Sequence, residues 1–352
     1  MNMHRRHFLQ LTSAAALIPS IAKAADAPKI RIGQIGTAHA HAAGKMTSVR
    51  GLPDLYEMVG IAEADDARWS GAEKSSAFQG LKRIPEAELI SDPRVAVVVV
   101  ETAIEDSVAT AMKCIDAGKH IHLDKPGALN HADFKRMRTS AAKRDLTVQM
   151  GYMLRYNPAF EFLFHAVRSG WLGEITEIDA AMGKLADART RDAIKTLPGG
   201  GMFELGCHMI DAVVTLLGRP SSVEAISTPT RDDGVADNQV ALLHYAKATA
   251  VLRCNHADPF GGPRRRFMVA GTEGVIDIQP MESGKFTLSL TQKRGQWNKG
   301  SQQVSLEVSK DRYLGEFQDL ARVVRGEKKL AWDAAHDIAV HETTLLASGQ
   351  KV

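Results

Sequence analysis

The segment AGKHIHLDKP, residues 117–126, predicts the end of a helix, a short strand and a lysine held where that strand ends. Gly118 suits a helix C-terminus, because glycine readily adopts the positive φ found there. Pro126 cannot continue the hydrogen bonding of a strand, so it fixes the turn after Lys125. Ligands of open α/β sheets bind beyond the carboxyl ends of the strands. Lys125 is therefore a candidate for polarising a substrate oxygen, and the alternative is an ordinary surface lysine.

The segments on either side of residues 117–126 alternate between strand and helix patterns, which predicts a doubly wound parallel sheet. The almost unbroken β-branched run at 95–100 is typical of a strand buried on both faces. We expect a Rossmann-like α/β domain over residues 28–150. Its predicted strands are 30–35, 56–63, 95–100, 121–123 and 147–150, and its helices are 41–51, 106–117 and 132–144.

The second half of the chain has a different pattern, in which strand-like segments follow one another with short turns. This predicts an α+β domain over residues 151–352 with a largely antiparallel open sheet. The expected strands are 175–182, 223–228, 239–245, 248–255, 266–270, 275–278 and 286–290. The expected helices are 158–169, 207–217, 313–324 and 334–347.

The N-terminus is typical of a twin-arginine export signal at residues 1–24. Arg5-Arg6 precede an apolar run and a small-residue cleavage site, Ala22-Lys23-Ala24. A basic N-terminal helix is the alternative. The signal predicts export, to the periplasm or beyond, and no cysteine near the cleavage site offers a lipid anchor for a membrane. Twin-arginine substrates are exported folded and often carry a cofactor.

The apparent basicity of the chain belongs to this N-terminal segment. The whole sequence has 44 Lys and Arg against 41 Asp and Glu, and residues 1–24 contain three of the basic residues and no acid. The rest is formally neutral and shows no nucleic-acid footprint. Cys114, Cys207 and Cys254 are too few for a disulfide framework and lack metal-type spacing. Cys114 and Cys207 fall in helical patterns, so we expect both to be buried small hydrophobic residues.

The turn after the first predicted strand is a weak dinucleotide fingerprint. Against G-x-G-x-x-G, residues 36–41 (GTAHAH) keep only Gly36. Glu63 ends the second strand where an acid would bind a ribose 2′-OH, although it can also be an ordinary strand-end acid. Because Ala64 follows it, NAD is favoured over NADP.

Two imidazoles in the same turn leave other chemistry open. His39 and His41 can bind sugar hydroxyls, phosphate or a metal. Their spacing is not that of a helical metal pair and the sequence supplies no third ligand, so we predict no metal site.

The segment GGGMFELGCHMID, residues 199–211, predicts a glycine loop followed by a helix from about Phe203. Glu204 and His208 are four residues apart and share a helical face. A carboxylate beside an imidazole orients it for general acid–base work. The alternative is a helix start with a capping acid and a structural histidine.

Four separate segments together resemble the Gfo/Idh/MocA oxidoreductases. They are AGKHIHLDKP, GYMLRYNP at 151–158, GGGMFELGCHMID and GTEGVI at 271–276. The resemblance implies that Lys125 contacts the reacting oxygen, that His208 exchanges the hydroxyl proton and that Glu204 occupies the position of the usual orienting aspartate. It also implies a homo-oligomer, a dimer or tetramer, formed through the C-terminal sheet.

The resemblance extends the list of candidate site residues. Departures from the family pattern include Asp124 for glutamate and Ala103 for proline after Thr102. The cofactor-binding candidates are Gly36, Thr37, Ala38, His39, His41, Glu63, Thr102, Asp124 and Pro126. The substrate-side candidates are Arg155, Tyr156, Asn157, Lys184 and a mainly structural Asp211.

These patterns predict an exported NAD-linked oxidoreductase that acts on a sugar, polyol or glycoside by hydride transfer. Because free NAD is scarce outside the cytoplasm, we expect a tightly held cofactor in a coupled or redox-neutral cycle. Two alternatives remain. One is a nucleotide-free sugar lyase or hydrolase, with or without a metal, and the other is a non-catalytic carbohydrate-binding protein.

Overall fold

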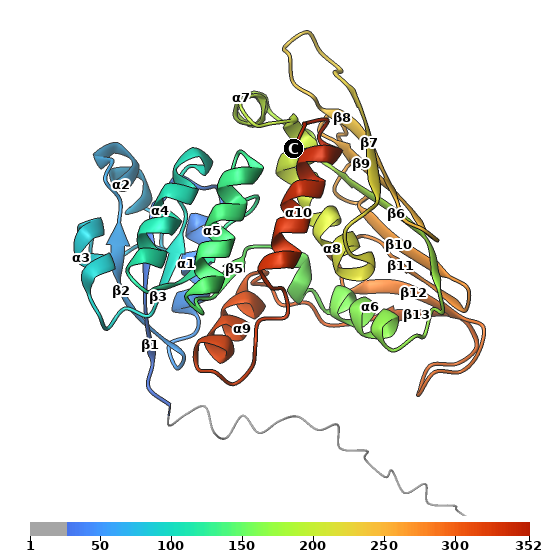
Figure 1. Cartoon of the computed structure of the whole chain (residues 1–352), viewed down its shortest axis with the longest axis horizontal. Helices are drawn as coiled ribbons and strands as arrows, with labels where there is room; N and C mark the ends of the chain where they lie inside the picture. The colour runs from blue at the N-terminus through green and yellow to red at the C-terminus, as the bar shows by residue number, and fades with distance from the viewer. Residues whose placement is uncertain (1–26) are drawn as a thin grey trace, which may run out of the picture.

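The computed structural model describes residues 27–352, which form two sheets joined by shared helices (Figure 1). The expected export signal, residues 1–24, lies outside the described residues. No helix in the described part is long and apolar enough to span a membrane. The three cysteines form no disulfide and are buried, which confirms the burial expected for Cys114 and Cys207.

The first sheet has five parallel strands in the order β2-β1-β3-β4-β5. The central strand β3 is four valines, each at most 1% exposed, because the strand is covered on both faces. This confirms the parallel sheet expected from the sequence. The strands are β1 (Ile30–Ile35), β2 (Tyr56–Ala62), β3 (Val97–Val100), β4 (His120–Leu123) and β5 (Val148–Met150).

Helices cover both faces of the first sheet, so it is doubly wound (Figure 1). One face packs against α4 and α5 and the other against α1 and α9. Phe317 and Leu320 of α9 join the core of Ile32 and Val97, although α9 comes near the end of the chain. The helices here are α1 (Ala42–Arg50), α2 (Asp66–Ala72), α3 (Glu86–Ser91), α4 (Ile104–Asp116), α5 (His131–Lys143) and α9 (Leu314–Val324).

The second sheet has eight strands in the order β13-β12-β11-β10-β6-β9-β8-β7. All neighbours are antiparallel except β6 and β9, which confirms the largely antiparallel sheet. The polar edge strand β13 was not predicted. The strands are β6 (Ile175–Gly183), β7 (Ser222–Thr228), β8 (Asn238–His244), β9 (Thr249–Asn255), β10 (Arg266–Gly271), β11 (Gly274–Ile278), β12 (Lys285–Leu290) and β13 (Gly300–Ser305).

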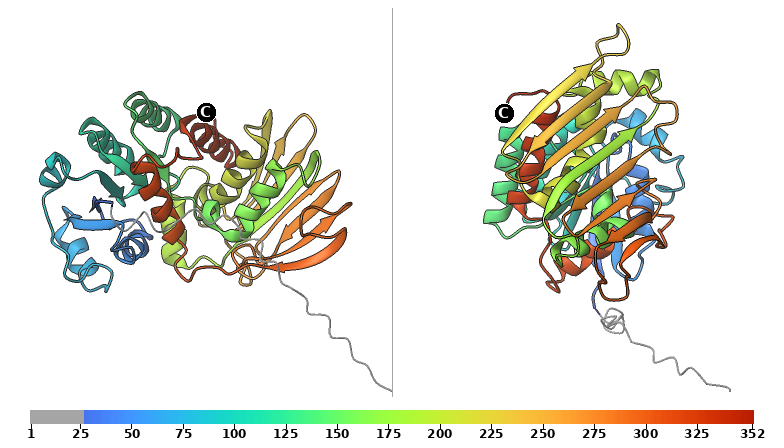
Figure 2. Two further views of the ribbon diagram at one scale, coloured as in Figure 1. Left: turned by 90° about the horizontal axis from the view of Figure 1, so that it is seen from below. Right: turned by 90° about the vertical axis from the view of Figure 1, so that its right-hand side faces the viewer.

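Helices pack on one face of the second sheet, and its other face carries no helix of the described residues (Figure 2). The helix α6 begins with Asn157 as N-cap and Pro158 at its first position. The helix α10 packs against both α5 and α8, so the two sheets share one continuous apolar core. The remaining helices are η2 (Met153–Tyr156), α6 (Pro158–Arg168), α7 (Ala188–Lys195), the π-helical turn η3 (Met202–Gly206), α8 (Cys207–Leu217) and α10 (Ala334–Ala347).

Candidate active site

The turn from β1 to α1 requires glycine at its first position. Gly36 has a φ of +87°, and a Cβ there would lie 2.7 Å from the backbone nitrogen of Thr102. The Gly36 N–H donates to the carbonyl of Ala62 at 2.8 Å. One glycine therefore suffices to bring the carboxyl ends of β1, β2 and β3 together, although the other two fingerprint glycines are replaced.

Glu63, directly after β2, faces this turn. Its carboxylate accepts hydrogen bonds from the backbone N–H and the hydroxyl of Thr37, at 2.9 and 2.7 Å, and from the N–H of Asp65 at 3.0 Å. Burial would raise the pKa of Glu63, but these hydrogen bonds outweigh it and lower the pKa. Glu63 is thus ionised at the end of β2, where the sequence placed an acid for a ribose hydroxyl.

A groove of about 590 Å³ opens along these strand ends, a volume suited to a nucleoside-sized ligand. Gly36, Ala38, Glu63 and Thr102 from the predicted set all line it. Two arginines that the sequence analysis missed also line it. Arg83 donates to the carbonyls of Glu63 and Ala64, and Nε of Arg68 lies 3.3 Å from Glu63 Oε1. Neither arginine follows the strand directly, so spacing alone did not reveal them.

Lys125 lies at the carboxyl end of β4 and is 4% exposed. Its Nζ donates to the backbone carbonyl of Glu204 at 2.7 Å and lies 3.4 Å from Oε1 of the same residue. Burial would lower the pKa of Lys125, but the charge of Glu204 outweighs it and raises the pKa. The next residue, Pro126, is buried beside it. Lys125 is therefore a fixed cation at the meeting point of the two sheets.

The carboxylate of Glu204 binds residues from three other segments. Besides Lys125, it accepts from Lys184 Nζ at 3.1 Å and from His256 Nε2 at 3.2 Å. Burial would raise the pKa of Glu204, but Lys125, His256 and Lys184 hold it well below its usual range. No hydrogen bond joins Glu204 to His208 among the described residues, so the expectation that Glu204 orients His208 is corrected.

His256 is a site residue that the sequence analysis missed. It follows β9 as Lys184 follows β6, and these two strands are parallel neighbours, so both side chains emerge at one edge of the sheet. That shared edge is the signal that could have revealed it. Gly201 makes room for the imidazole, because a Cβ there would lie 2.3 Å from His256 Nδ1.

His208, in the first turn of α8, is 3% exposed. Its Nδ1 has no hydrogen-bond partner in the described part of the chain, and its ring lies edge-on to Tyr152 at 5.9 Å. Burial and then the charge of Lys125 lower its pKa well below 6.5. The imidazole is therefore neutral at physiological pH and can accept a proton.

Arg155 lies in the interior rather than at an open surface. It is 1% exposed, and its guanidinium donates to Asp211 at 2.6 Å and to Asp337 at 2.7 Å. Tyr156 donates to Asp319 at 3.1 Å and Asn157 caps α6. The expectation that Arg155 contacts a substrate is corrected, because its buried guanidinium is paired with two carboxylates inside the protein. Asp211 is structural, as expected.

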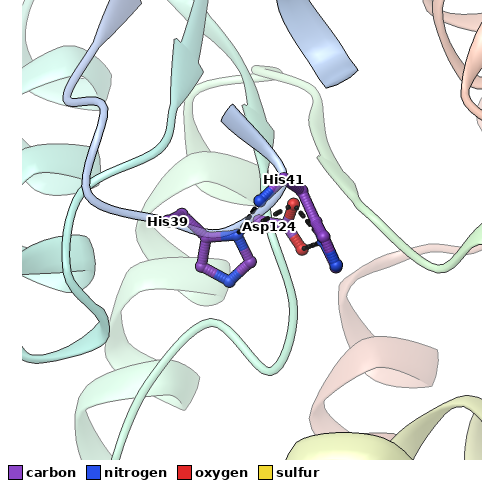
Figure 3. Close-up of side chains that lie close together, drawn as sticks. All are labelled: His39, His41 and Asp124. Atoms are coloured by element: carbon purple, nitrogen blue, oxygen red, sulfur yellow. Dashed lines mark hydrogen bonds and ion pairs between the residues drawn. The ribbon is translucent and has the colours of Figure 1, made fainter. Parts of the chain in front are cut away.

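His39, His41 and Asp124 lie together at the amino end of α1 (Figure 3). The Nδ1 atoms of His39 and His41 lie 3.4 and 3.0 Å from Oδ2 of Asp124. Burial lowers the pKa of His39 to about 4, although the charge of Asp124 opposes the shift. Burial would raise the pKa of Asp124, but the surrounding imidazoles and Lys45 lower it strongly.

Comparison with known protein families identifies the class of protein. Residues 30–152 match the model of an oxidoreductase family with an NAD-binding Rossmann fold, and residues 160–277 match the Gfo/Idh/MocA C-terminal domain. Together these matches span more than half of the chain. The chain therefore belongs to the Gfo/Idh/MocA oxidoreductases, as the sequence motifs suggested.

Relatives of known sequence include an uncharacterized oxidoreductase, YhhX, from Escherichia coli, 29% identical over 53% of this chain and 54% of its own length. A trans-1,2-dihydrobenzene-1,2-diol dehydrogenase from Bos taurus is 28% identical over 56% of this chain. The matched regions span little more than half of these relatives, 54% and 60% of their lengths.

Solved structures extend the likeness over the whole fold. A levoglucosan dehydrogenase in complex with NADH and levoglucosan has a TM-score of 0.78 at 17% identity and covers 92% of this chain and 98% of its own. A UDP-N-acetylglucosamine 3-dehydrogenase from Acidithiobacillus ferrooxidans has a TM-score of 0.77 at 17% identity, with the same two coverages. These likenesses confirm the two-domain fold.

Proposed function

We propose that this protein is an exported NAD-dependent oxidoreductase that acts on a hydroxyl group of a sugar, polyol or glycoside. One observation carries the proposal: Lys125, at the end of β4 in the nucleotide domain, is bonded directly to Glu204 of the second domain. Thr102 lines both the groove at the strand ends and a smaller cavity beside Lys125, and the charge of Lys125 also acts on the candidate proton carrier His208.

The residues present fit a dinucleotide. Gly36 permits a tight turn after β1 against the backbone of Thr102, and α1 then begins at Ala42, where a helix N-terminus can face a phosphate. Glu63 places an ionised carboxylate where a ribose 2′-hydroxyl can bind, which favours NAD over the 2′-phosphate of NADP. When bound, the nicotinamide supplies hydride transfer to or from the substrate carbon.

The protein side of the reaction follows from two buried groups. Lys125 keeps its positive charge and donates to the substrate oxygen, which stabilises negative charge that develops there. His208 is neutral and takes the hydroxyl proton as hydride leaves the same carbon, then returns it in the reverse step. Glu204 holds Lys125 and Lys184 in place and does not itself exchange the proton.

Two further parts of the proposal concern the setting of the enzyme. The N-terminal segment favours twin-arginine export to the periplasm with the cofactor already bound. Since exchangeable NAD is scarce there, the reaction is coupled or redox-neutral and regenerates its own cofactor. The uncovered face of the second sheet favours pairing with another copy of the chain (Figure 2).

The first experiment measures the bound cofactor. The protein is purified after expression with its own signal, denatured, and the supernatant analysed by mass spectrometry. We expect near-stoichiometric NAD in the supernatant. When a panel of sugars, polyols and glycosides is added to the intact protein, we expect the bound NAD to be reduced, which is measured as the appearance of NADH absorbance. Absence of any nucleotide, with no binding of added NAD or NADP, would refute the proposal.

A matched pair of lysine variants tests the catalytic assignment. Lys125→Met retains the length of the side chain but not its charge, so bound NAD should remain while its reduction slows about 10²–10³-fold. Lys143→Met, on the exposed end of α5, is the control and should change neither quantity. Equal rates in the two variants would remove Lys125 from the mechanism.

A further inference from the structure

Three neighbouring parallel strands bring three possible metal ligands together, with a fourth, Glu101, beside one of them. His39 and His41 lie in the turn after β1, Glu101 directly follows β3, and Asp124 directly follows β4. Because β1, β3 and β4 are adjacent, their carboxyl ends meet, and Figure 3 shows both imidazoles turned toward the Asp124 carboxylate. The sequence lacked a third ligand for the two histidines, and the fold supplies it.

Three separations between these ligand atoms match those around a small divalent cation. Oδ2 of Asp124 lies 3.0 Å from Nδ1 of His41 and 3.4 Å from Nδ1 of His39. Oε2 of Glu101 lies 3.5 Å from Nδ1 of His39. Neighbouring ligand atoms bound at about 2.0–2.2 Å in tetrahedral or octahedral geometry lie about 2.8–3.6 Å from one another. The side chains therefore need little rearrangement to bind such an ion.

Glu101 supplies a second, independent observation. It is fully buried, and neither carboxyl oxygen has a hydrogen-bond partner in the part of the chain that the structure describes. A buried polar group without a partner is destabilising. A cation between Glu101, Asp124 and the imidazoles would satisfy these oxygens, whereas the adjacent ammonium of Lys45 is bonded to Glu316 instead.

A second cluster in the described residues shows why ligand type alone does not make a site. Asp211, His336 and Asp337 also lie close together. There, however, the guanidinium of Arg155 bonds both carboxylates, and Arg138 pairs with Asp337. By contrast, no lysine or arginine of residues 27–352 forms an ion pair with Asp124 or Glu101. Of these two clusters, the one at α1 has carboxylates that no arginine or lysine of the described residues occupies.

We propose that His39, His41, Asp124 and Glu101 form a binding site for one divalent cation of the zinc class, at the amino end of α1. Two imidazoles with carboxylates are ligands suited to Zn²⁺, Co²⁺ and similar ions rather than to Ca²⁺. The site lies beside Lys125, so an ion there adjoins the reaction centre. The inference does not rest on the proposed oxidoreductase function.

The test uses the mature chain after treatment with a chelator. Zn²⁺ is titrated calorimetrically, and Co²⁺ binding is followed by its visible d–d absorption, which reports nitrogen and oxygen ligands directly. We expect one equivalent per chain. In the double variant His39→Gln/His41→Gln, and separately in Glu101→Gln, which keeps both imidazoles, the affinity should fall by about 100-fold and about 10-fold or more respectively. Circular dichroism checks that each variant is folded.

His336→Gln, in the arginine-occupied cluster, is the matched control and should bind as tightly as the unchanged chain. The proposal is overturned by absence of stoichiometric binding, by equal affinity in the double variant, or by an equal loss in His336→Gln. If the double variant does not fold, unchanged affinity in Glu101→Gln overturns it by itself. Protein that carries NAD but binds no metal would refute the metal site and leave the proposed function intact.

Discussion

His256 Nε2 lies 3.2 Å from Oε2 of Glu204, and this pair, rather than a pair of Glu204 with His208, organises the site in the second domain. Glu204 is thereby the common acceptor for one imidazole and two lysines. His208 is held by burial and by the edge of the Tyr152 ring. The carboxylate therefore acts on the reaction through Lys125, which makes it a positioning residue.

We expect Glu204→Gln to change the pH dependence of the reaction as well as its rate. The charge of Glu204 raises the pKa of Lys125, so its loss lowers that pKa and moves the alkaline decline of kcat to lower pH. The maximal kcat should fall about 10- to 100-fold. A pH–rate profile with the substrate found in the panel measures both effects. Glu57→Gln, distant on β2, is the control, and an unshifted alkaline limb in Glu204→Gln would contradict the argument.

Substitution of His208 should lower kcat much more than substitution of His256. His208→Gln removes the proposed proton carrier, so kcat should fall about 10²–10⁴-fold with little change in KM. His256→Gln keeps a hydrogen-bond donor for Glu204, so the loss should stay within about 10-fold. Steady-state kinetics of the two variants side by side decide between them, and a greater loss in His256→Gln would reverse the assignment.

The sequence predicted those features that depend on local pattern. The valines of β3 indicated a doubly covered strand, and the glycine–proline frame around Lys125 placed it at a strand end. The helix α7 (ARTRDAIK) and the edge strand β13 (GSQQVS) each contain a single large apolar residue, Ile194 and Val304, and both elements were missed. The short helices α2 and α3 were missed as well.

Contacts between residues far apart in the chain could not be predicted from local sequence patterns. The ion pairs of Arg155 depend on Asp211 and on Asp337, which is 182 residues further along the chain. Spacing suggested a helical Glu204–His208 pair, but η3 is a π-helical turn, and Glu204 faces the end of β9 instead. Likewise Asp124 and Glu101 join the histidine pair only because β1, β3 and β4 are neighbours in the sheet.

Glu63→Gln should relax the preference for NAD. The ionised carboxylate repels a 2′-phosphate, and Arg68 and Arg83 in the same groove would attract one once that charge is gone. We expect the ratio of the NAD and NADP dissociation constants to shift about 10-fold toward NADP. Fluorescence titration of NADH and NADPH into nucleotide-free protein measures the ratio. An unchanged ratio would show that Glu63 does not face the ribose.

Arg155→Met should affect stability rather than substrate affinity. The substitution removes the shared guanidinium and leaves Asp337 with Arg138 and Asp211 with His336 alone; breaking a buried ion pair destabilises proteins by about 3–5 kcal/mol. Chemical denaturation measures the free energy of unfolding, and steady-state kinetics on the folded fraction measures KM. Arg168→Met, near the end of α6, is the control. A raised KM with normal stability would return Arg155 to the substrate site.

Acid should destabilise the fold partly through His341, which is 1% exposed and stacks on Phe134. Burial lowers the pKa of His341 to about 4. Because an unfolded histidine titrates near 6.5, the unfolded chain binds more protons between about pH 6.5 and 4. The contribution of His341 is therefore fully present above pH 6.5 and is lost as the pH falls through that window, by about 3 kcal/mol in all.

The His341→Gln variant isolates this contribution. The variant lacks the hydrogen bond that Nε2 of His341 makes with the Ala128 carbonyl, so it should be less stable at pH 7. Its free energy of unfolding should nevertheless decline less between pH 7 and 4 than that of the unchanged chain, since Gln does not titrate. Urea denaturation across this range measures both slopes, with the exposed His165→Gln as control. Parallel slopes in all three proteins would show that His341 is not the titrating group.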